Sequence, residues 1–138
     1  MAPNIKTSVD KLIADAEREI QTLDVAEAIR LHSRDDVVFV DIRDIRELAR
    51  DGRIPGAFHC PRGMLEFWVD PESPYHKPVF GDDKEYVLFC AAGWRSALAA
   101  KTLVEMGLTN VAHIEGGFGA WKQAGHPVAD KAKKGGGQ

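Results

Sequence analysis

The chain has 138 residues, of which 44% are hydrophobic and 28% are charged, as is typical of one globular domain with its own core. Its formal net charge of -3 gives no broad basic surface, so we expect no nucleic-acid partner. The sequence has no apolar run near the roughly 20 residues that span a bilayer, and no secretory layout at its start. Two cysteines are too few for a disulfide framework, so we expect free thiols and a cytoplasmic location.

Strands and helices are expected to alternate along the chain. Apolar residues recur at helical spacing between residues 8 and 20 and indicate an amphipathic N-terminal helix. Short apolar runs bounded by turn residues indicate strands. The elements expected next are a helix over 24–31 capped by Thr22 or Asp24, a strand over 37–44, a helix over 45–52, a strand over 54–60, a helical turn over 64–68, a strand over 86–89, a helix over 96–106, a strand over 111–114 and a helix over 118–124.

This alternation predicts an α/β fold in a single domain, with a central, mostly parallel sheet of about five strands and helices on both faces. The runs VVFV and YVLF are apolar at successive positions, as in strands that are covered on both sides. We assign residues 1–21 to an extra N-terminal helix, 22–128 to the α/β domain and the Gly- and Lys-rich segment 129–138 to a disordered tail.

Cys90 stands where an apolar strand gives way to a short loop and a helix. The free N–H groups and the positive dipole end of a helix N-terminus favour an anion there, and hence the nucleophilic thiolate. Gly93 allows the loop to curl with its N–H groups inward, and Ala91 and Ala92 are too small to fill the loop. We therefore predict a thiolate in a cradle of backbone amides. The alternative is a buried cysteine that only packs.

Three segments resemble the rhodanese (thiosulfate sulfurtransferase) homology domain. The loop CAAGWRS is similar to the active-site loop of its single-domain form, C-x-x-G-x-R. The other two segments are VVFVDIRDIRELARDGRIPGAFHCP, which is similar to a strand followed by Asp-x-Arg and a helix, and VAHIEGGFGAWKQAGHPV, which is similar to the closing strand, Gly-Gly turn and Trp-bearing helix. The resemblance covers residues 22 to 128 and implies the rhodanese-like form of the α/β fold.

The resemblance implies a sulfurtransferase whose nucleophile is Cys90. The cysteine takes a sulfane sulfur from a donor, holds it as a persulfide and passes it to a thiol or to cyanide. Candidate donors are thiosulfate, polysulfides, and persulfides on thiols or on a protein sulfur carrier. Some relatives carry basic residues where this chain has Ala91 and Ala92, which disfavours thiosulfate. We expect no cofactor, no metal, no membrane partner, and a monomer or homodimer.

The resemblance also implies roles for residues around Cys90. The substrate-binding loop comprises Ala91, Ala92, Gly93, Trp94, Arg95 and Ser96. We expect Arg95 to brace this loop by pairing with Asp41 or Glu47, rather than to bind an anion. The residues that resemble the family's structural pair are Asp41 and Arg43. An apolar rim over the cysteine is expected from Trp94, Met64, Phe67 and Trp68, unless these side chains only cover the core.

Two other functions stay open. A cysteine phosphatase or arsenate reductase would use the same thiolate, but related phosphatases have a longer loop than the four residues between Cys90 and Arg95. A non-catalytic binding or regulatory module would need neither the cysteine nor the arginine. Cys60 is a candidate partner for a disulfide with Cys90, although a small core residue is expected there. The histidines show no metal-ligand spacing and are expected to be structural or solvent-facing.

Overall fold

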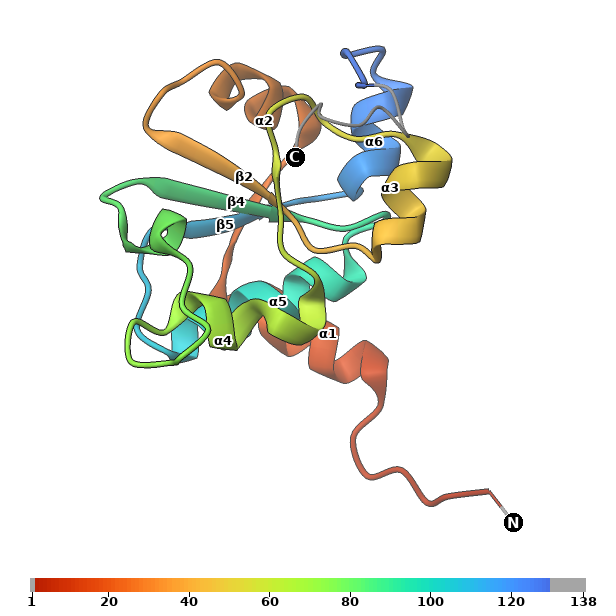
Figure 1. Ribbon diagram of the computed structural model, residues 1–138. Coiled ribbons are helices and arrows are strands. Elements are labelled where there is room, and N and C mark those ends of the chain that lie inside the picture. Colours follow the sequence, from red (N-terminus) through yellow and green to blue (C-terminus); the bar gives the residue numbers. More distant parts are fainter. Residues whose placement is uncertain (1, 130–138) are drawn as a thin grey trace.

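The computed structural model describes residues 2–129, and they form a five-stranded sheet with helices on both faces (Figure 1). The strands are β1 (Gln21–Leu23), β2 (Val37–Asp41), β3 (Phe58–His59), β4 (Glu85–Phe89) and β5 (Val111–Ile114). They lie in the order β1-β5-β4-β2-β3, and every neighbouring pair is parallel. The carboxyl ends of all five strands therefore meet at one edge. The predicted α/β fold class is confirmed.

The helices divide between the two faces of the sheet (Figure 1). One face is covered by α1 (Val9–Glu19), α4 (Leu65–Val69) and α5 (Trp94–Glu105), and the other by α2 (Val25–Leu31), α3 (Ile45–Asp51) and α6 (Gly117–Gln123). Two short 3₁₀ helices, η1 (Arg62–Met64) and η2 (Pro78–Gly81), lie in the connection between β3 and β4. In the part of the chain that the structure describes, every helix is too short or too polar to cross a membrane.

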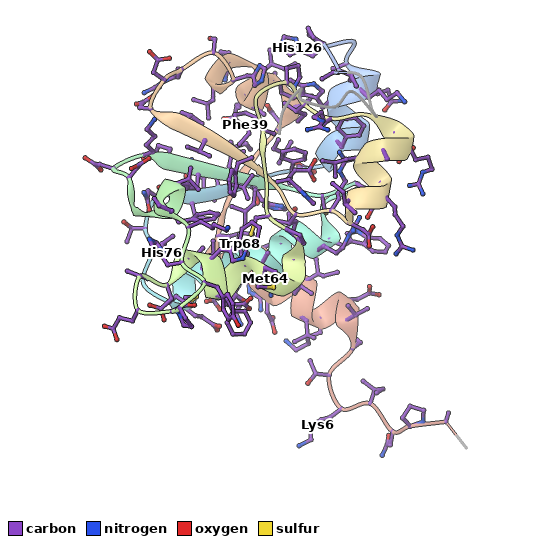
Figure 2. All side chains as sticks on the ribbon, in the orientation of Figure 1. Lys6, Phe39, Met64, Trp68, His76 and His126 are labelled. Carbon is purple, nitrogen blue, oxygen red and sulfur yellow. The ribbon has the colours of Figure 1, made fainter. Side chains whose placement is uncertain are left out.

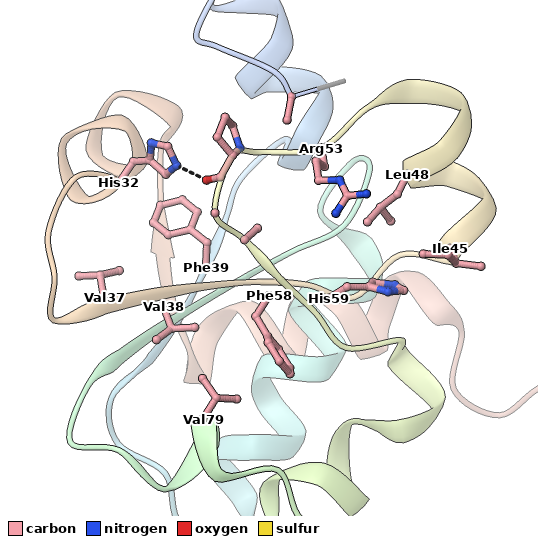
Figure 3. A pocket seen from close by; sticks show the side chains of 14 residues that line it. His32, Val37, Val38, Phe39, Ile45, Leu48, Arg53, Phe58, His59 and Val79 are labelled. Carbon is pink, nitrogen blue, oxygen red and sulfur yellow. Dashed lines mark hydrogen bonds between the residues drawn. The ribbon is translucent and has the colours of Figure 1, made fainter. Parts of the chain in front are cut away.

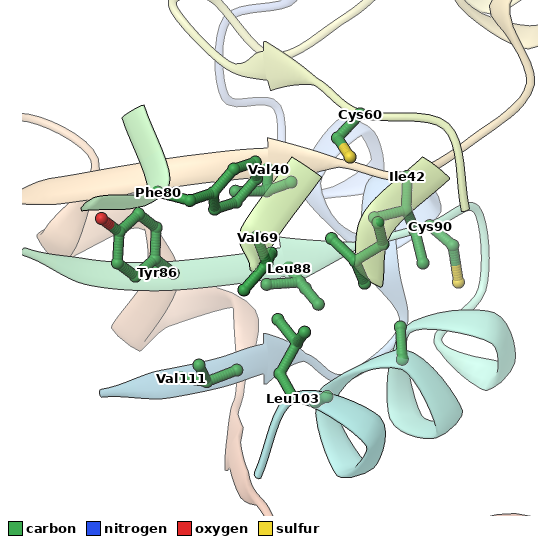
Figure 4. Packing of buried hydrophobic residues seen from close by; sticks show 13 residues of the cluster. Val40, Ile42, Cys60, Val69, Phe80, Tyr86, Leu88, Cys90, Leu103 and Val111 are labelled. Atoms are coloured by element: carbon green, nitrogen blue, oxygen red, sulfur yellow. The ribbon is translucent and has the colours of Figure 1, made fainter. Parts of the chain in front are cut away.

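Each face of the sheet buries its own hydrophobic cluster. Figure 4 shows the cluster between the sheet and the helices α4 and α5, in which Val40, Leu88 and Leu103 pack together. The opposite cluster packs Phe39, Phe89 and Trp121 beneath α2 and α6. Full burial of one such side chain stabilises the fold by ~1.5–3 kcal/mol. The two clusters therefore pack against β4 from both faces of the sheet.

The helices α2 and α3 each have a capping box at their N-terminus. Asp24 is the N-cap of α2, where its carboxylate accepts from the Glu27 N–H at 2.8 Å and the Glu27 carboxylate accepts from the Asp24 N–H at 2.9 Å. Thr22, the other cap considered, lies in β1 instead. Asp44 and Glu47 form the same capping box at α3.

Two expected elements begin two or more residues away from the predicted position, and one observed strand was not expected. The strand predicted over 54–60 is only Phe58–His59, since a turn forms at residues 55–56. The helix after Cys90 begins at Trp94 rather than Ser96, with Gly93 as its N-cap. The strand β1 was not predicted at all, because only Leu23 of its three residues is buried.

The ends of the α/β domain are held by two further contacts. The helix α1 packs against α5, with Ala16 fully buried. At the other end, Ala129 exchanges backbone hydrogen bonds with Arg53 at 2.8 and 3.4 Å. The remainder of the predicted tail, residues 130–138, lies outside the described residues. The division of the chain at residues 21 and 128 stays a prediction.

Candidate active site

Cys90 follows the last residue of β4, and its sulfur faces the N-terminus of α5. The Gly93 N–H donates to Sγ at 3.1 Å, and the Ser96 N–H donates to it at 3.4 Å. The Sγ atom also lies 3.7 Å from the Ser96 hydroxyl oxygen. Two of the loop amides expected to form a cradle are thus directed at the sulfur. The cysteine is only 1% exposed, so it sits at the base of the loop and not on its rim.

The loop keeps this shape because its carbonyl groups are bound from outside. The Phe118 N–H donates to the Cys90 carbonyl at 2.8 Å, and the Gly119 N–H donates to the Ala91 carbonyl at 3.0 Å. Both donors lie in the first turn of α6. The Gly93 backbone has φ +106°, a left-handed value that favours glycine. With the Cys90 and Ala91 carbonyls bound from outside and a left-handed turn at Gly93, the loop directs the Gly93 and Ser96 amides at the sulfur.

Gly117 is expected to be essential for this contact between α6 and the loop. Its φ is +57°, and an added Cβ would overlap the Cys90 carbonyl oxygen and lie 2.9 Å from the Ala91 carbonyl carbon. The left-handed conformation alone costs an L-residue roughly 1–2 kcal/mol, and the overlap adds to that cost. We therefore expect Gly117→Ala to lower the free energy of unfolding by more than the conformational cost and to reduce the reactivity of Cys90.

A matched control for Gly117→Ala is Gly125→Ala. Gly125 has φ +80°, but an added Cβ there meets nothing within 4 Å. Urea unfolding of both variants separates the backbone strain, which they share, from the overlap, which only Gly117→Ala creates. Equal losses of stability would show that close approach to the loop is unimportant.

Asp41 and Arg43 form a buried ion pair beside the loop. The Arg43 guanidinium donates to the Asp41 carboxylate at 3.0 and 2.8 Å and to the Gly52 carbonyl at 2.9 Å. It also lies 4.2 Å from the centre of the Phe118 ring. Both charged side chains are at most 1% exposed. The pair therefore joins the end of β2, the end of α3 and the start of α6 into one support for the loop.

Arg95 pairs with Glu47, one of the two partners expected from the sequence. Its two terminal nitrogens donate to the two carboxylate oxygens at 2.8 and 3.0 Å. The pKa of Glu47 lies below its ordinary value, mainly because its carboxylate accepts hydrogen bonds from Arg95. Because Glu47 also caps α3, the pair ties the Cys90 loop to that helix. The other expected partner, Asp41, is taken by Arg43.

The Glu47 pair predicts a dependence of stability on pH. The folded-state pKa of Glu47 is below the ordinary value of 4.5. The carboxylate therefore contributes stability that is fully present above pH 4.5 and is lost as the pH falls through the folded-state pKa. We expect Glu47→Gln to be less stable than the wild type at neutral pH, with the difference shrinking in acid. Urea unfolding of both proteins across this range tests it; a difference that stays constant in acid would contradict it.

The four candidate rim residues occupy different environments. Trp94 is 67% exposed at the first position of α5, and Phe67 is 51% exposed on α4. Met64 and Trp68 are half-buried; Met64 ends η1, and Trp68 lies within α4 (Figure 2). The Trp68 ring packs edge-on against Phe58 and beneath the Lys77 ammonium. Trp94 is thus the candidate that belongs to the Cys90 loop segment and is also open to solvent.

Cys60 is a free, fully buried thiol in the same core cluster as Cys90 (Figure 4). Burial is the main cause that raises its pKa to about 12. At neutral pH it is therefore protonated and a poor nucleophile. This chemistry favours the expectation of a small core residue over a resolving cysteine.

One residue next to the site was missed by the sequence reasoning. The His113 Nδ1 atom lies 2.8 Å from the Ser96 hydroxyl oxygen, which is itself the neighbour of the Cys90 sulfur. Both residues are buried. No local motif marks this contact, because β5 and α5 bring the two residues together from 17 positions apart.

A cavity of about 850 Å³ lies away from the cysteine, beside β2 and β3 (Figure 3). Its lining includes Phe39, Leu48, Phe58 and Val79, and no residue of the segment 90–96 contributes to it. The cavity therefore does not mark the reactive centre. Within residues 2–129, the structure contains no group of three or more His, Cys, Asp or Glu side chains placed to hold a metal ion.

Several known proteins are similar to this chain in sequence and in fold. A structure from Rhodopseudomonas palustris, described as a protein of unknown function and possible tyrosine phosphatase, is 58% identical with a TM-score of 0.90, over 93% of this chain and 98% of that one. Thiosulfate sulfurtransferase GlpE of Coxiella burnetii is 32% identical over 78% of this chain and 91% of its own. The polysulfide-sulfur transferase homodimer of Wolinella succinogenes is 28% identical, with a TM-score of 0.65 over 91% and 90% of the two chains.

The family model described as rhodanese-like domain matches residues 24–124. This range holds the Cys90 loop, the Asp41–Arg43 pair, Glu47 and the first turn of α6. It agrees with the resemblance seen in the sequence. The chain belongs to the rhodanese-like domain family.

Proposed function

We propose that the protein is a sulfurtransferase that carries a sulfane sulfur as a persulfide on Cys90. The observation that supports it most is the pair of N–H groups, from Gly93 and Ser96, directed at the sulfur. Hydrogen bonds to an ionised group are about twice as strong as those between neutral groups. The loop therefore favours a negative sulfur at this position, which is what sulfur transfer requires.

The proposed reaction has two displacements at sulfur. In the first, the Cys90 thiolate attacks the terminal sulfur of the donor, a new S–S bond forms, and the old S–S bond breaks. The leaving group departs with the electron pair as a thiolate, a shorter polysulfide or sulfite. In the second, a thiolate or cyanide attacks the outer sulfur of the persulfide, and the Cys90 thiolate leaves. No external oxidant or reductant is consumed.

The surroundings of the loop support polysulfides and persulfides as donors over thiosulfate. Ala91 and Ala92 supply no positive charge, and the Arg95 guanidinium is engaged by Glu47. The charged SO₃ group of thiosulfate, which carries three oxygens next to the transferred sulfur, thus meets no unpaired cation in the segment 90–96. Since Cys90 is 1% exposed, a linear donor with a one-atom tip suits the site better than a branched one. The activity named for the Wolinella relative agrees with this choice.

The same features disfavour phosphate hydrolysis, which the description of the Rhodopseudomonas structure suggests. A phosphate ester presents a tetrahedral group with three oxygens outside the reacting bond, and it needs a wider cradle. Arginine would have to bind those oxygens, but Arg95 faces Glu47 at 2.8 Å. We therefore propose sulfur transfer as the activity of this thiolate and hydrolysis as the alternative to be tested.

We also propose that Trp94 contacts the carrier of the donor sulfur. Its side chain is exposed, adjoins Arg95, and begins the helix that ends the loop. A thiol persulfide or a protein that carries sulfur would supply an apolar surface for it. The cytoplasmic location and the monomeric or homodimeric state remain predictions from the sequence.

Mass spectrometry of the intact protein tests the proposed function. The protein is incubated with thiosulfate, inorganic polysulfide or glutathione persulfide, then desalted and weighed. We expect the mass of one sulfur atom to be added by polysulfide and by glutathione persulfide, more weakly by thiosulfate, and to be removed by cyanide as thiocyanate. The absence of an adduct with all three donors, together with hydrolysis of an aryl phosphate, would replace sulfur transfer by phosphatase activity.

A further inference from the structure

A buried histidine lies behind the reactive loop and contacts it through one hydroxyl group. His113 is on β5, 1% exposed, and its Nδ1 atom is 2.8 Å from the Ser96 hydroxyl oxygen. That oxygen is 3.7 Å from the Cys90 sulfur and 3.3 Å from the Gly93 carbonyl oxygen. The histidine therefore contacts the hydroxyl, and the hydroxyl contacts the sulfur, in a chain of three side chains. The displacement mechanism above uses neither the histidine nor the hydroxyl.

The surroundings of His113 decide which ring nitrogen carries the proton. Burial lowers the pKa of His113 to about 4, so the ring is neutral at neutral pH and carries a single N–H. Its Nε2 atom is buried and has no hydrogen-bond partner among residues 2–129. A buried N–H without an acceptor is rare and costly. The proton therefore belongs on Nδ1, where the Ser96 oxygen accepts it.

This assignment fixes what the Ser96 hydroxyl can donate to. Because its oxygen accepts from His113, its own hydrogen is directed to the Gly93 carbonyl or to the Cys90 sulfur. With a protonated thiol, the hydroxyl donates to the carbonyl and the S–H group donates to the hydroxyl oxygen. With a thiolate, the hydroxyl turns its hydrogen to the sulfur. In both arrangements the imidazole N–H holds the oxygen in place.

We propose that His113 is a positioning residue that holds the Ser96 hydroxyl as a third hydrogen-bond donor to the Cys90 thiolate, after the Gly93 and Ser96 amides. The third donor stabilises the thiolate relative to the thiol, beside the Arg95 guanidinium, whose charge also acts on Cys90. It also stabilises the thiolate that leaves when the persulfide is consumed. The first effect concerns the free cysteine alone, and the second rests on the proposed sulfurtransferase function.

The experiment compares variants that keep or remove the N–H donor. His113→Phe removes it while filling the buried space, and His113→Asn keeps it, because the asparagine amide nitrogen occupies a place close to that of Nδ1. Ser96→Ala removes the hydroxyl but leaves the Ser96 backbone N–H. Val111→Ala is the control, since Val111 is buried on the same strand and in the cluster of Figure 4.

Two quantities are measured for each folded variant. The first is the thiolate ultraviolet absorbance at neutral pH, to which Cys60 contributes nothing because its pKa is about 12. The second is the single-turnover rate of sulfur transfer from the persulfidated protein to cyanide. Because a hydrogen bond to a charged group is stronger than one between neutral groups, we expect Ser96→Ala to lower this transfer rate roughly 10-fold. We expect a loss of roughly 3- to 10-fold in His113→Phe, and values close to wild type in His113→Asn and Val111→Ala.

The double variant Ser96→Ala/His113→Phe tests whether the histidine acts through the hydroxyl. We expect it to match Ser96→Ala alone in both measurements. A further loss on adding His113→Phe would overturn the proposal, as would wild-type thiolate absorbance in the single variant His113→Phe. If the wild type forms no persulfide while His113→Phe still lowers its thiolate absorbance, the proposed function fails and the positioning role stands. If the wild type forms the persulfide but His113→Phe changes neither measurement, the proposed function stands and the positioning role of His113 fails.

Discussion

Replacing Asp41 with alanine is expected to produce the largest loss of stability of any variant considered for this protein. The change leaves the Arg43 guanidinium, 1% exposed, without its carboxylate. Removing one partner of a buried ion pair costs about 3–5 kcal/mol, because the remaining charge has left water without a counterion. We expect a loss of that order in the free energy of unfolding, measured by urea denaturation.

The chain contains a matched control for Asp41→Ala. Arg34 and Asp36 form a pair of the same kind, also two residues apart, with hydrogen bonds of 3.0 and 2.7 Å. Both side chains are more than half exposed, and exposed pairs contribute little. We expect Asp36→Ala to unfold at nearly the wild-type urea concentration. If the two alanine variants lost the same stability, burial would not be what makes the Asp41–Arg43 pair important.

Replacing Cys90 with serine is expected to abolish sulfur transfer. A hydroxyl group stays protonated at neutral pH and forms no persulfide, although serine is close in shape to cysteine and can accept from the same two amides. We expect no mass increase with polysulfide, no thiocyanate from cyanide, and a stability close to that of the wild type. Both assays use the same purified protein as the unfolding measurement.

Cys60→Ala is the companion variant, since it removes the other thiol. Cys60 is fully buried and its pKa is raised to about 12. We expect this variant to acquire one sulfur atom at the wild-type rate, with a lower stability from the lost packing. Sulfur transfer that persists in Cys90→Ser and is lost in Cys60→Ala would show that the nucleophile is Cys60 and not Cys90.

The fold class and the Cys90 loop could be predicted because their causes lie within short segments. Apolar runs specify the buried strands β2, β4 and β5, and the loop needs only a glycine and a helix start close to the cysteine. The structure places the Gly93 and Ser96 amides at the sulfur, as expected. The partner of Arg95 could be narrowed to two carboxylates of the segment VDIRDIRE, Asp41 and Glu47, of which Glu47 is the one observed.

Contacts between distant segments could not be predicted from the sequence. The strand β1 has one buried residue and owes its place to pairing with β5. The support of the loop carbonyls by α6 requires knowing that Gly117 approaches Ala91. His113 looked like an ordinary strand residue, because its partner Ser96 becomes a neighbour only when α5 packs on β5. In each case the contact forms only because tertiary packing brings together residues that are far apart in the sequence.

The proposed function depends on loop amides that stabilise a negative sulfur bonded to Cys90. A crystal structure of the protein after reaction with polysulfide tests this most directly. We predict one additional sulfur atom bonded to Cys90 Sγ, with its outer surface within hydrogen-bond distance of N–H groups from the segment 91–96. A sulfur atom bonded to Cys60, or one at Cys90 that points away from those amides, would contradict the claim.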